Sequence, residues 1–179
     1  KIFLAGVGEL MTEVAGEVCD GFLCHGFTTE KYLREVTIPA LARGRAKAGK
    51  TMEGFEIVGP SFVVTGNSEE EMAAAIAGTR QQIAFYGSTP AYRNVLDAHG
   101  WGGLQDELNS LSKMGKWVDM GNLITDEILN TFAVVGEPET IAPELHRRYG
   151  DVIQRISFYA PYKSDPERWA TVLEALKSA

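Results

Sequence analysis

The sequence predicts an α/β fold in which parallel strands alternate with helices. Short apolar runs recur along the 179 residues, and most of them are followed by a stretch with apolar residues at helical spacing. The runs hold too few polar residues for an exposed sheet, which is typical of parallel strands covered on both faces. Strands are expected over residues 2–5, 21–24, 55–65, 132–135 and 153–158.

The first expected helix covers residues 9–18. Leu10, Val14 and Val18 recur there at helical spacing and should form its buried face. Acidic residues in the first turn, which complement the helix dipole, mark the start of the helix after the third strand. Further helices are expected over residues 69–86, 138–149 and 166–177.

Two prolines fall inside expected elements. A long helix is expected over residues 30–48, and Pro39, which lacks an N–H, should kink or divide it. In the strand over residues 55–65, Gly59 and Pro60 should produce an irregularity. Neither interrupts the alternation of strands and helices.

Residues 88–130 depart from this alternation. They offer only helix-like pieces separated by glycines, so we expect an insertion of short helices between two strand units. Residues 1–179 as a whole are expected to form a single domain that contains this insertion. The helix-like pieces cover residues 90–98, 104–114 and 126–129.

The charge and the cysteine content exclude several classes of function. Acidic residues outnumber basic ones by 24 to 17, and the net charge of −7 argues against a nucleic-acid or membrane partner. No apolar run is long enough to span a membrane, and the basic region of a signal peptide is missing from the opening residues. Cys19 and Cys24 have neither disulfide nor metal-site spacing, so we expect buried thiols, a reducing cytoplasm and no metal site.

Two architectures contain such a succession of units: a doubly wound open sheet and part of an eight-stranded β/α barrel. The chain begins without Met, one residue before an apolar run. We therefore expect half of a barrel, cut from a parent of about 250 residues or more. A half-barrel leaves two strand edges open, and another copy or the missing half has to cover them. A dinucleotide-binding open sheet is disfavoured, because no third glycine follows Gly6 and Gly8 at the required spacing.

Candidate ligand-binding residues follow the first two expected strands. Gly6, Val7 and Gly8 form a turn before a helix, where backbone amides can approach an anion. Residues 24–29 follow the second strand and bring His25 and two threonine hydroxyls that can hydrogen-bond a phosphate. One of the two threonines is expected to cap the next helix.

Other candidate residues have either a functional role or a purely structural one. Tyr86, Tyr92 and Trp101 either line a flat cavity for a ring system or pack against helices. Arg80 and Arg93 either pair with an anionic tail or lie at the surface. The motifs of serine hydrolases, P-loop enzymes and zinc proteases do not occur in the sequence.

The run LAGVGELMTEVAGEVCDGFLCHGFTTEKYL, residues 4–33, resembles the corresponding stretch of the luciferase-like monooxygenase superfamily. Its A-G-x-x-x-D-G element lies at residues 15–21, and residues 81–101 and 132–145 are similar to the branch that uses the deazaflavin coenzyme F420. The resemblance covers essentially the whole chain. It implies the C-terminal half of a (βα)8 TIM barrel, strands five to eight, with the insertion after strand seven and residues 132–135 outside the barrel sheet.

The resemblance also implies a cofactor site. In the family, F420 or FMN lies across the C-terminal mouth of the barrel, and the loops after strands five and six contact its phosphate. Some deazaflavin dehydrogenases have a lysine at the position of Thr28 and a hydroxyl residue at that of His25, so FMN is the alternative to F420. By position, the implied contacts fall on Gly6, Val7, Gly8, Cys24, His25 and Thr28.

The implied reaction is hydride transfer between F420 and a small organic substrate. The family's substrate-directed residues lie largely in the first half of the barrel, so no catalytic residue is assigned and the chain alone is expected to be inactive. His25 could assist proton transfer. We also expect a homo-oligomer. The alternatives are an FMN-dependent monooxygenase of the same superfamily and a non-enzymatic half-barrel that associates with itself as a scaffold.

Overall fold

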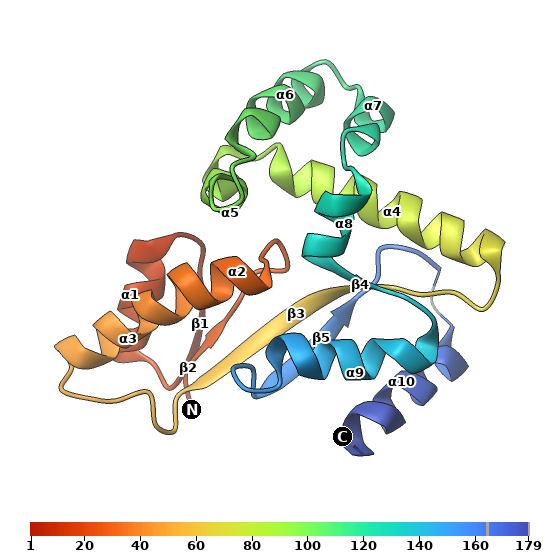
Figure 1. Ribbon diagram of the computed structural model, residues 1–179. Coiled ribbons are helices and arrows are strands. Elements are labelled where there is room, and N and C mark those ends of the chain that lie inside the picture. The colour runs from red at the N-terminus through yellow and green to blue at the C-terminus, as the bar shows by residue number, and fades with distance from the viewer. Residues whose placement is uncertain (164, 179) are drawn as a thin grey trace.

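The computed structural model describes residues 1–163 and 165–178, and its strands form one sheet (Figure 1). The strand order is β1-β2-β3-β4, β5 also pairs with β3, and every pair is parallel. The prediction of an α/β fold with parallel strands is confirmed. The strands are β1 (Phe3–Ala5), β2 (Gly21–Leu23), β3 (Glu56–Val64), β4 (Ala133–Val135) and β5 (Arg155–Tyr159).

Each strand is followed by helices, as the alternation predicts. The start of α4 is fixed by Ser68, whose side chain accepts a hydrogen bond from the N–H of Glu71. The helices that follow the strands are α1 (Glu9–Val18), α2 (Glu30–Tyr32), α3 (Ile38–Lys47), α4 (Glu69–Gly87), α9 (Pro138–Tyr149) and α10 (Pro166–Ser178).

β3 runs unbroken through Gly59 and Pro60, so the expected irregularity is wrong. The carbonyls of Val58 and Val64 accept hydrogen bonds from residues that follow β2 and β4, on one side of the strand. Pro60 is an even number of residues from both, so its backbone groups face the same side of β3. It lies between the stretch of β3 that pairs with β2 and the stretch that pairs with β4. Its missing N–H therefore interrupts no hydrogen bond between β3 and those strands.

Residues 133–135 lie inside the sheet as β4, which corrects the expectation that residues 132–135 lie outside it. Phe62, Val63 and Val64 of β3 pair with β4 in parallel. The pairing of β2 with β3 ends at Val58, so the upper part of β3 is open on that side. β4 occupies this place and hydrogen-bonds the end of β3.

The sheet separates two apolar cores. Phe62 and Val64 belong to the core that α4 and the short helices cover, whereas Ile57 and Val63 belong to the core formed with α1, α3, α9 and α10. This alternation follows from the period of two along a strand. The loop after β2 lies where the cores meet, since Cys24 belongs to the second core and Phe27 to the first.

α1 does not bury the stripe that its apolar residues suggest. Leu10, Val14 and Val18 are 83%, 44% and 64% exposed, so the expected buried face is wrong. The helix packs closely on α3, and only small side chains permit this approach. The buried residues of α1 are Thr12, Ala15 and Gly16.

Pro39 divides the long helix expected over residues 30–48. Between α2 and α3 lies a π-helical turn, η1 (Leu33–Thr37), in which the N–H of Ile38 bonds the carbonyl of Leu33 five residues earlier. Proline cannot donate to the carbonyl four residues before it, and the wider turn accommodates this loss.

Short helices fill the chain between α4 and β4. In Figure 1 α5, α6 and α7 stand away from the sheet, beside α4. The sequence analysis did not anticipate α7. The description of residues 88–130 as an insertion within one domain stays a prediction. The elements are η2 (Pro90–Tyr92), α5 (Arg93–Asp97), α6 (Gly102–Lys113), α7 (Trp117–Asn122) and α8 (Asp126–Phe132).

Candidate functional site

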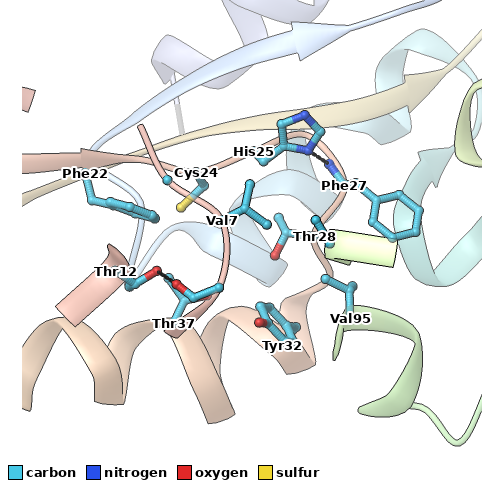
Figure 2. A pocket seen from close by; sticks show the side chains of 13 residues that line it. Val7, Thr12, Phe22, Cys24, His25, Phe27, Thr28, Tyr32, Thr37 and Val95 are labelled. Carbon is cyan, nitrogen blue, oxygen red and sulfur yellow. Dashed lines mark hydrogen bonds between the residues drawn. The ribbon is translucent and has the colours of Figure 1, made fainter. Parts of the chain in front are cut away.

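The loops after β1 and β2 meet in a small pocket of about 30 Å³ (Figure 2). Both loops follow the carboxyl ends of neighbouring parallel strands, where α/β folds carry their binding sites. The six residues assigned by the resemblance all line it: Gly6, Val7, Gly8, Cys24, His25 and Thr28. The sequence analysis did not single out the other lining residues, which are Thr12, Phe22, Phe27, Tyr32, Thr37, Ala91 and Val95.

The N-terminus of α1 lies beside this pocket, which Gly8 and Thr12 line. Gly8 precedes the helix with φ 81° and ψ 156°, a conformation that is essentially restricted to glycine. No side chain among the described residues caps the helix, so its first-turn N–H groups have no partner within the helix or from a cap there. A Cβ built on Gly8 would meet nothing within 4 Å, so the approach is open. Features of this kind at a helix N-terminus favour an anion.

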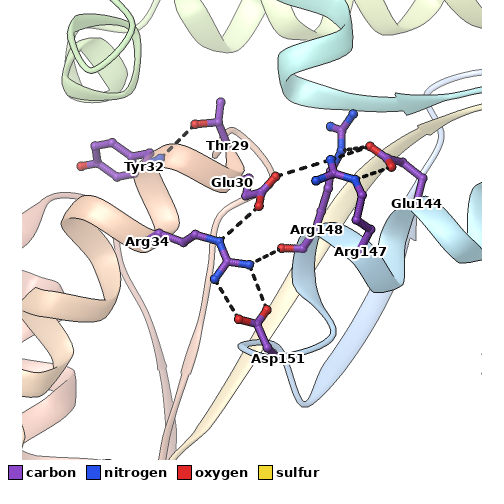
Figure 3. Close-up of polar contacts among 8 residues, drawn as sticks. All are labelled: Thr29, Glu30, Tyr32, Arg34, Glu144, Arg147, Arg148 and Asp151. Carbon is purple, nitrogen blue, oxygen red and sulfur yellow. Dashed lines mark hydrogen bonds and ion pairs between the residues drawn. The ribbon is translucent and has the colours of Figure 1, made fainter.

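The two threonines after β2 have different tasks. Thr29 caps α2, because its hydroxyl accepts a hydrogen bond of 3.1 Å from the N–H of Tyr32 (Figure 3). The same hydroxyl lies 2.8 Å from Nε2 of His99. The hydroxyl of Thr28 lines the pocket and has no hydrogen-bond partner among the described residues. Of the two threonines, Thr28 is therefore the one whose hydroxyl is not engaged by another described residue.

Cys24 contributes a thiol wall rather than a reactive group. The side chain is buried, and burial raises the pKa of its thiol to about 12. The thiol stays protonated at neutral pH and is not a nucleophile there. Cys24 and Cys19 are both buried and free, as the sequence analysis expects.

His25 is fixed by contacts on several sides. Its Nδ1 accepts a hydrogen bond of 3.0 Å from the N–H of Phe27, and its Nε2 lies 3.3 Å from the hydroxyl of Tyr92. The Tyr92 ring stacks on the imidazole at 4.7 Å, and the Tyr86 ring meets it edge-on at 4.8 Å. Burial lowers the pKa of His25, so the imidazole is neutral at pH 7. Trp101 does not join this group, because it stacks on His99.

A cluster of ion pairs ties α2 and η1 to α9 and the turn that follows it (Figure 3). Arg34 donates two hydrogen bonds of 2.9 Å to Asp151 and one of 3.2 Å to Glu30. It also donates to the carbonyl of Arg148 at 2.9 Å, so one guanidinium joins three segments. Hydrogen bonds from Arg147 and Arg148 hold the pKa of Glu144 down, at about 2.

The cations of this cluster are satisfied by carboxylates, and the described residues that line the pocket include no lysine or arginine. Arg80 and Arg93, considered above as partners of an anionic tail, pair instead with Asp126 and Asp106. An anion in the pocket would therefore be held by neutral N–H and O–H donors and by the α1 dipole.

Within residues 1–163 and 165–178, His, Cys, Asp and Glu side chains nowhere gather in a group of three that could hold a metal ion. In the same part of the chain, every helix is too short or too polar to cross a membrane.

Comparisons with known proteins agree with the resemblance. A model of the luciferase-like monooxygenase family matches residues 1–155. An uncharacterized protein of Mycobacterium tuberculosis is 53% identical over 156 residues, which cover 87% of this chain and 46% of that protein. A 5,10-methylenetetrahydromethanopterin reductase of Archaeoglobus fulgidus is 27% identical over 163 residues, which cover 87% of this chain and 43% of the reductase.

The fold has a known counterpart. The coenzyme F420 dependent tetrahydromethanopterin reductase from Methanopyrus kandleri superposes with a TM-score of 0.73 and 17% sequence identity. The superposition covers 97% of this chain and 48% of the reductase, and it confirms the predicted partial (βα)8 barrel. The chain spans about half the length of the curated relatives it matches.

Proposed function

The chain belongs to the luciferase-like monooxygenase family, and from this we propose that it supplies the phosphate-binding loops of an F420-dependent oxidoreductase. One observation carries the proposal: the loops after β1 and β2 gather the six residues of the resemblance around one pocket. The two reductases described above support F420 over FMN, since one is named for that coenzyme and both match nearly all of this chain.

A phosphate group suits the donors of this pocket. The first-turn N–H groups of α1 and the free hydroxyl of Thr28 are hydrogen-bond donors, and Gly8 leaves room for close approach. The pocket is too small for a tricyclic ring, so it suits the phosphate end of the cofactor and not its ring.

When bound, F420 supplies the hydride chemistry, and the substrate is a small organic compound. Phe22 and Phe27 wall the phosphate pocket with apolar side chains that exclude water. The neutral His25 ring, held between the rings of Tyr86 and Tyr92, adds a rigid wall on another side of the pocket. No catalytic residue is assigned in this chain, and the chain alone is expected to be inactive in turnover.

Cofactor binding tests the proposal directly. The chain is titrated with F420 and, in parallel, with FMN, and the fluorescence of each cofactor reports the bound fraction. We expect saturable binding of F420 that is tighter than that of FMN. Tighter binding of FMN would favour the FMN-dependent monooxygenase, and binding of neither cofactor would overturn the cofactor site.

A pair of threonine variants localises the site. Thr28→Ala removes the free hydroxyl and should weaken F420 binding about tenfold, because a hydrogen bond to a charged group contributes roughly 1.5 kcal/mol. Thr171→Ala is the matched control, since its hydroxyl donates to the Glu167 carbonyl on the exposed face of α10. Equal affinities of the two variants would place the phosphate elsewhere.

The self-associating scaffold is the second candidate, and the exposed apolar residues of α1 favour it. A fold that keeps Leu10 and Val18 in water has a surface suited to a second copy. Strong self-association together with no binding of either cofactor would support this candidate and contradict the oxidoreductase.

A further inference from the structure

Four polar aromatic side chains from separate parts of the chain meet beside the pocket. His25 follows β2, Tyr86 lies near the end of α4, Tyr92 is in η2, and Tyr159 ends β5. All four are half-buried, and they lie toward the carboxyl ends of the strands. The hydroxyls of Tyr86 and Tyr159 are 3.1 Å apart. Binding sites of parallel α/β folds are built at this end of the sheet.

The hydrogen bonds of His25 leave the hydroxyl proton of Tyr92 available to a ligand. Because Nδ1 accepts the N–H of Phe27, the neutral imidazole carries its proton on Nε2. Nε2–H then donates to the hydroxyl oxygen of Tyr92 at 3.3 Å. The hydroxyl proton of Tyr92 is left without an acceptor among the described residues.

The tyrosine pair leaves a second donor. Tyr86 and Tyr159 have two hydroxyl protons, and their mutual hydrogen bond uses one of them. The other proton has no acceptor in the described part of the chain. Burial, together with the Tyr86 hydroxyl, raises the pKa of Tyr159 to about 12, so Tyr159 remains uncharged and able to donate at neutral pH.

We propose that Tyr92 and the Tyr86–Tyr159 pair form a hydrogen-bond-donor site for a carbonyl oxygen of an organic ligand, with His25 as the residue that positions Tyr92. Free donors call for an acceptor, and the surrounding rings suit the apolar part of such a ligand. Identifying this ligand as the substrate of hydride transfer rests on the proposed function, whereas the donor site itself does not.

Carbon-13 NMR of the chain labelled at tyrosine Cζ tests the site, with cyclohexanone as the probe. We expect saturable shifts of the Tyr92 signal and of at least one signal of the pair, with Kd on the order of 1 mM for so small a ligand. The Tyr162 signal is an internal control, because that hydroxyl donates to the Val63 carbonyl and accepts from the Thr65 N–H.

Variants separate donation from ring packing. Tyr92→Phe and Tyr159→Phe each keep the ring and should weaken cyclohexanone binding about fivefold, as expected for one lost hydrogen bond. Unchanged binding in both variants would overturn the donor role, and so would the absence of saturable shifts in the unaltered chain.

The F420 titration on the same samples keeps the two proposals apart. F420 binding without a cyclohexanone response would refute the donor site and leave the proposed function standing. A cyclohexanone response without F420 binding would refute the proposed function and leave the donor site standing. His25→Ala serves as the positioning test: it should weaken cyclohexanone binding and move the Tyr92 signal while the Tyr162 signal stays in place.

Discussion

His25 shows how a single residue acquires its charge state from its surroundings. The loop after β2 turns the N–H of Phe27 toward Nδ1, and this bond requires the unprotonated nitrogen. Partial burial under Tyr86 and Tyr92 also disfavours the imidazolium. Both effects act in the same direction, so folding and protonation of His25 oppose each other.

The consequence is a pH dependence of stability. Burial lowers the pKa of His25 from its usual 6.5, so its stabilising contribution is complete above pH 6.5 and is lost as the pH falls below that value. Urea denaturation gives the free energy of unfolding at neutral pH and in mild acid. The decrease between the two conditions should be larger for the natural chain than for His25→Gln. A parallel decline of the two proteins would mean that another group, such as His99, carries the effect.

The sequence indicated the pocket residues because loop positions follow from strand ends. Gly6, Val7, Gly8 and Thr28 all follow predicted strands, and parallel strands place these ends together. Tyr159 was missed as a site residue because its partner Tyr86 is 73 positions earlier in the chain, and no local pattern records such a contact. The sequence also left open whether Thr28 or Thr29 caps α2, because either side chain can cap a helix and the backbone geometry decides between them.

At the scale of elements, two glycines let α1 and α3 approach each other. A Cβ on Gly16 would collide with the carbonyl oxygen of Leu41, and a Cβ on Gly44 with that of Glu13. Backbone therefore meets backbone where the helices cross, and the apolar side chains of α1 are turned away from α3. A pattern of apolar residues cannot reveal this, because the contact is made by residues without side chains.

Gly44→Ala should separate α1 from α3 and lower the free energy of unfolding by about 1–3 kcal/mol, the usual cost of overpacking. Gly103→Ala is the control, because it lies in α6 and a Cβ there meets nothing within 4 Å. That variant should gain up to about 1 kcal/mol from the better helix propensity of alanine. Thermal or urea unfolding measures both. Equal effects of the two substitutions would show that the helix crossing tolerates a methyl group.

A buried arginine attaches α10 to the end of β3. Arg168 is 5% exposed, and it donates to the carbonyl of Thr65 at 3.0 Å and to Glu71 at 2.8 Å. Arg168→Leu leaves that carbonyl without its donor and should cost about 3 kcal/mol of unfolding free energy. Arg155→Leu removes an exposed guanidinium from Glu56, which keeps its ion pair with Lys1, and should change the unfolding free energy by less than about 1 kcal/mol. A small loss in Arg168→Leu would mean that packing alone holds α10.

At the scale of the whole molecule, β1 forms an edge of the sheet that no other described strand covers. β1 pairs only with β2 among the described strands, and the residues around this edge are apolar and exposed. Chains that expose such edges pair with other strands or aggregate unless something covers them. The alternation in the sequence predicted parallel strands with helices, and the half-barrel came from the opening of the chain and from the family resemblance. The place of β4 could not be predicted, because it depended on where β2 stops pairing with β3. The exposed large apolar residues between the start of the chain and the end of β2 are Ile2, Val7, Leu10, Met11, Val14, Val18 and Leu23.

This exposed face predicts that the chain associates with itself. Leu10 and Val18, 83% and 64% exposed, lie on α1, and their burial against a second copy would remove apolar surface from water. Sedimentation velocity at micromolar concentration should show a dimer or larger species, and Leu10→Lys combined with Val18→Lys should shift it to the monomer. Leu173→Lys, at an exposed position of α10, is the control and should leave the association unchanged. A monomeric natural chain would contradict the prediction. Dissociation by the control variant instead would move the interface to α10.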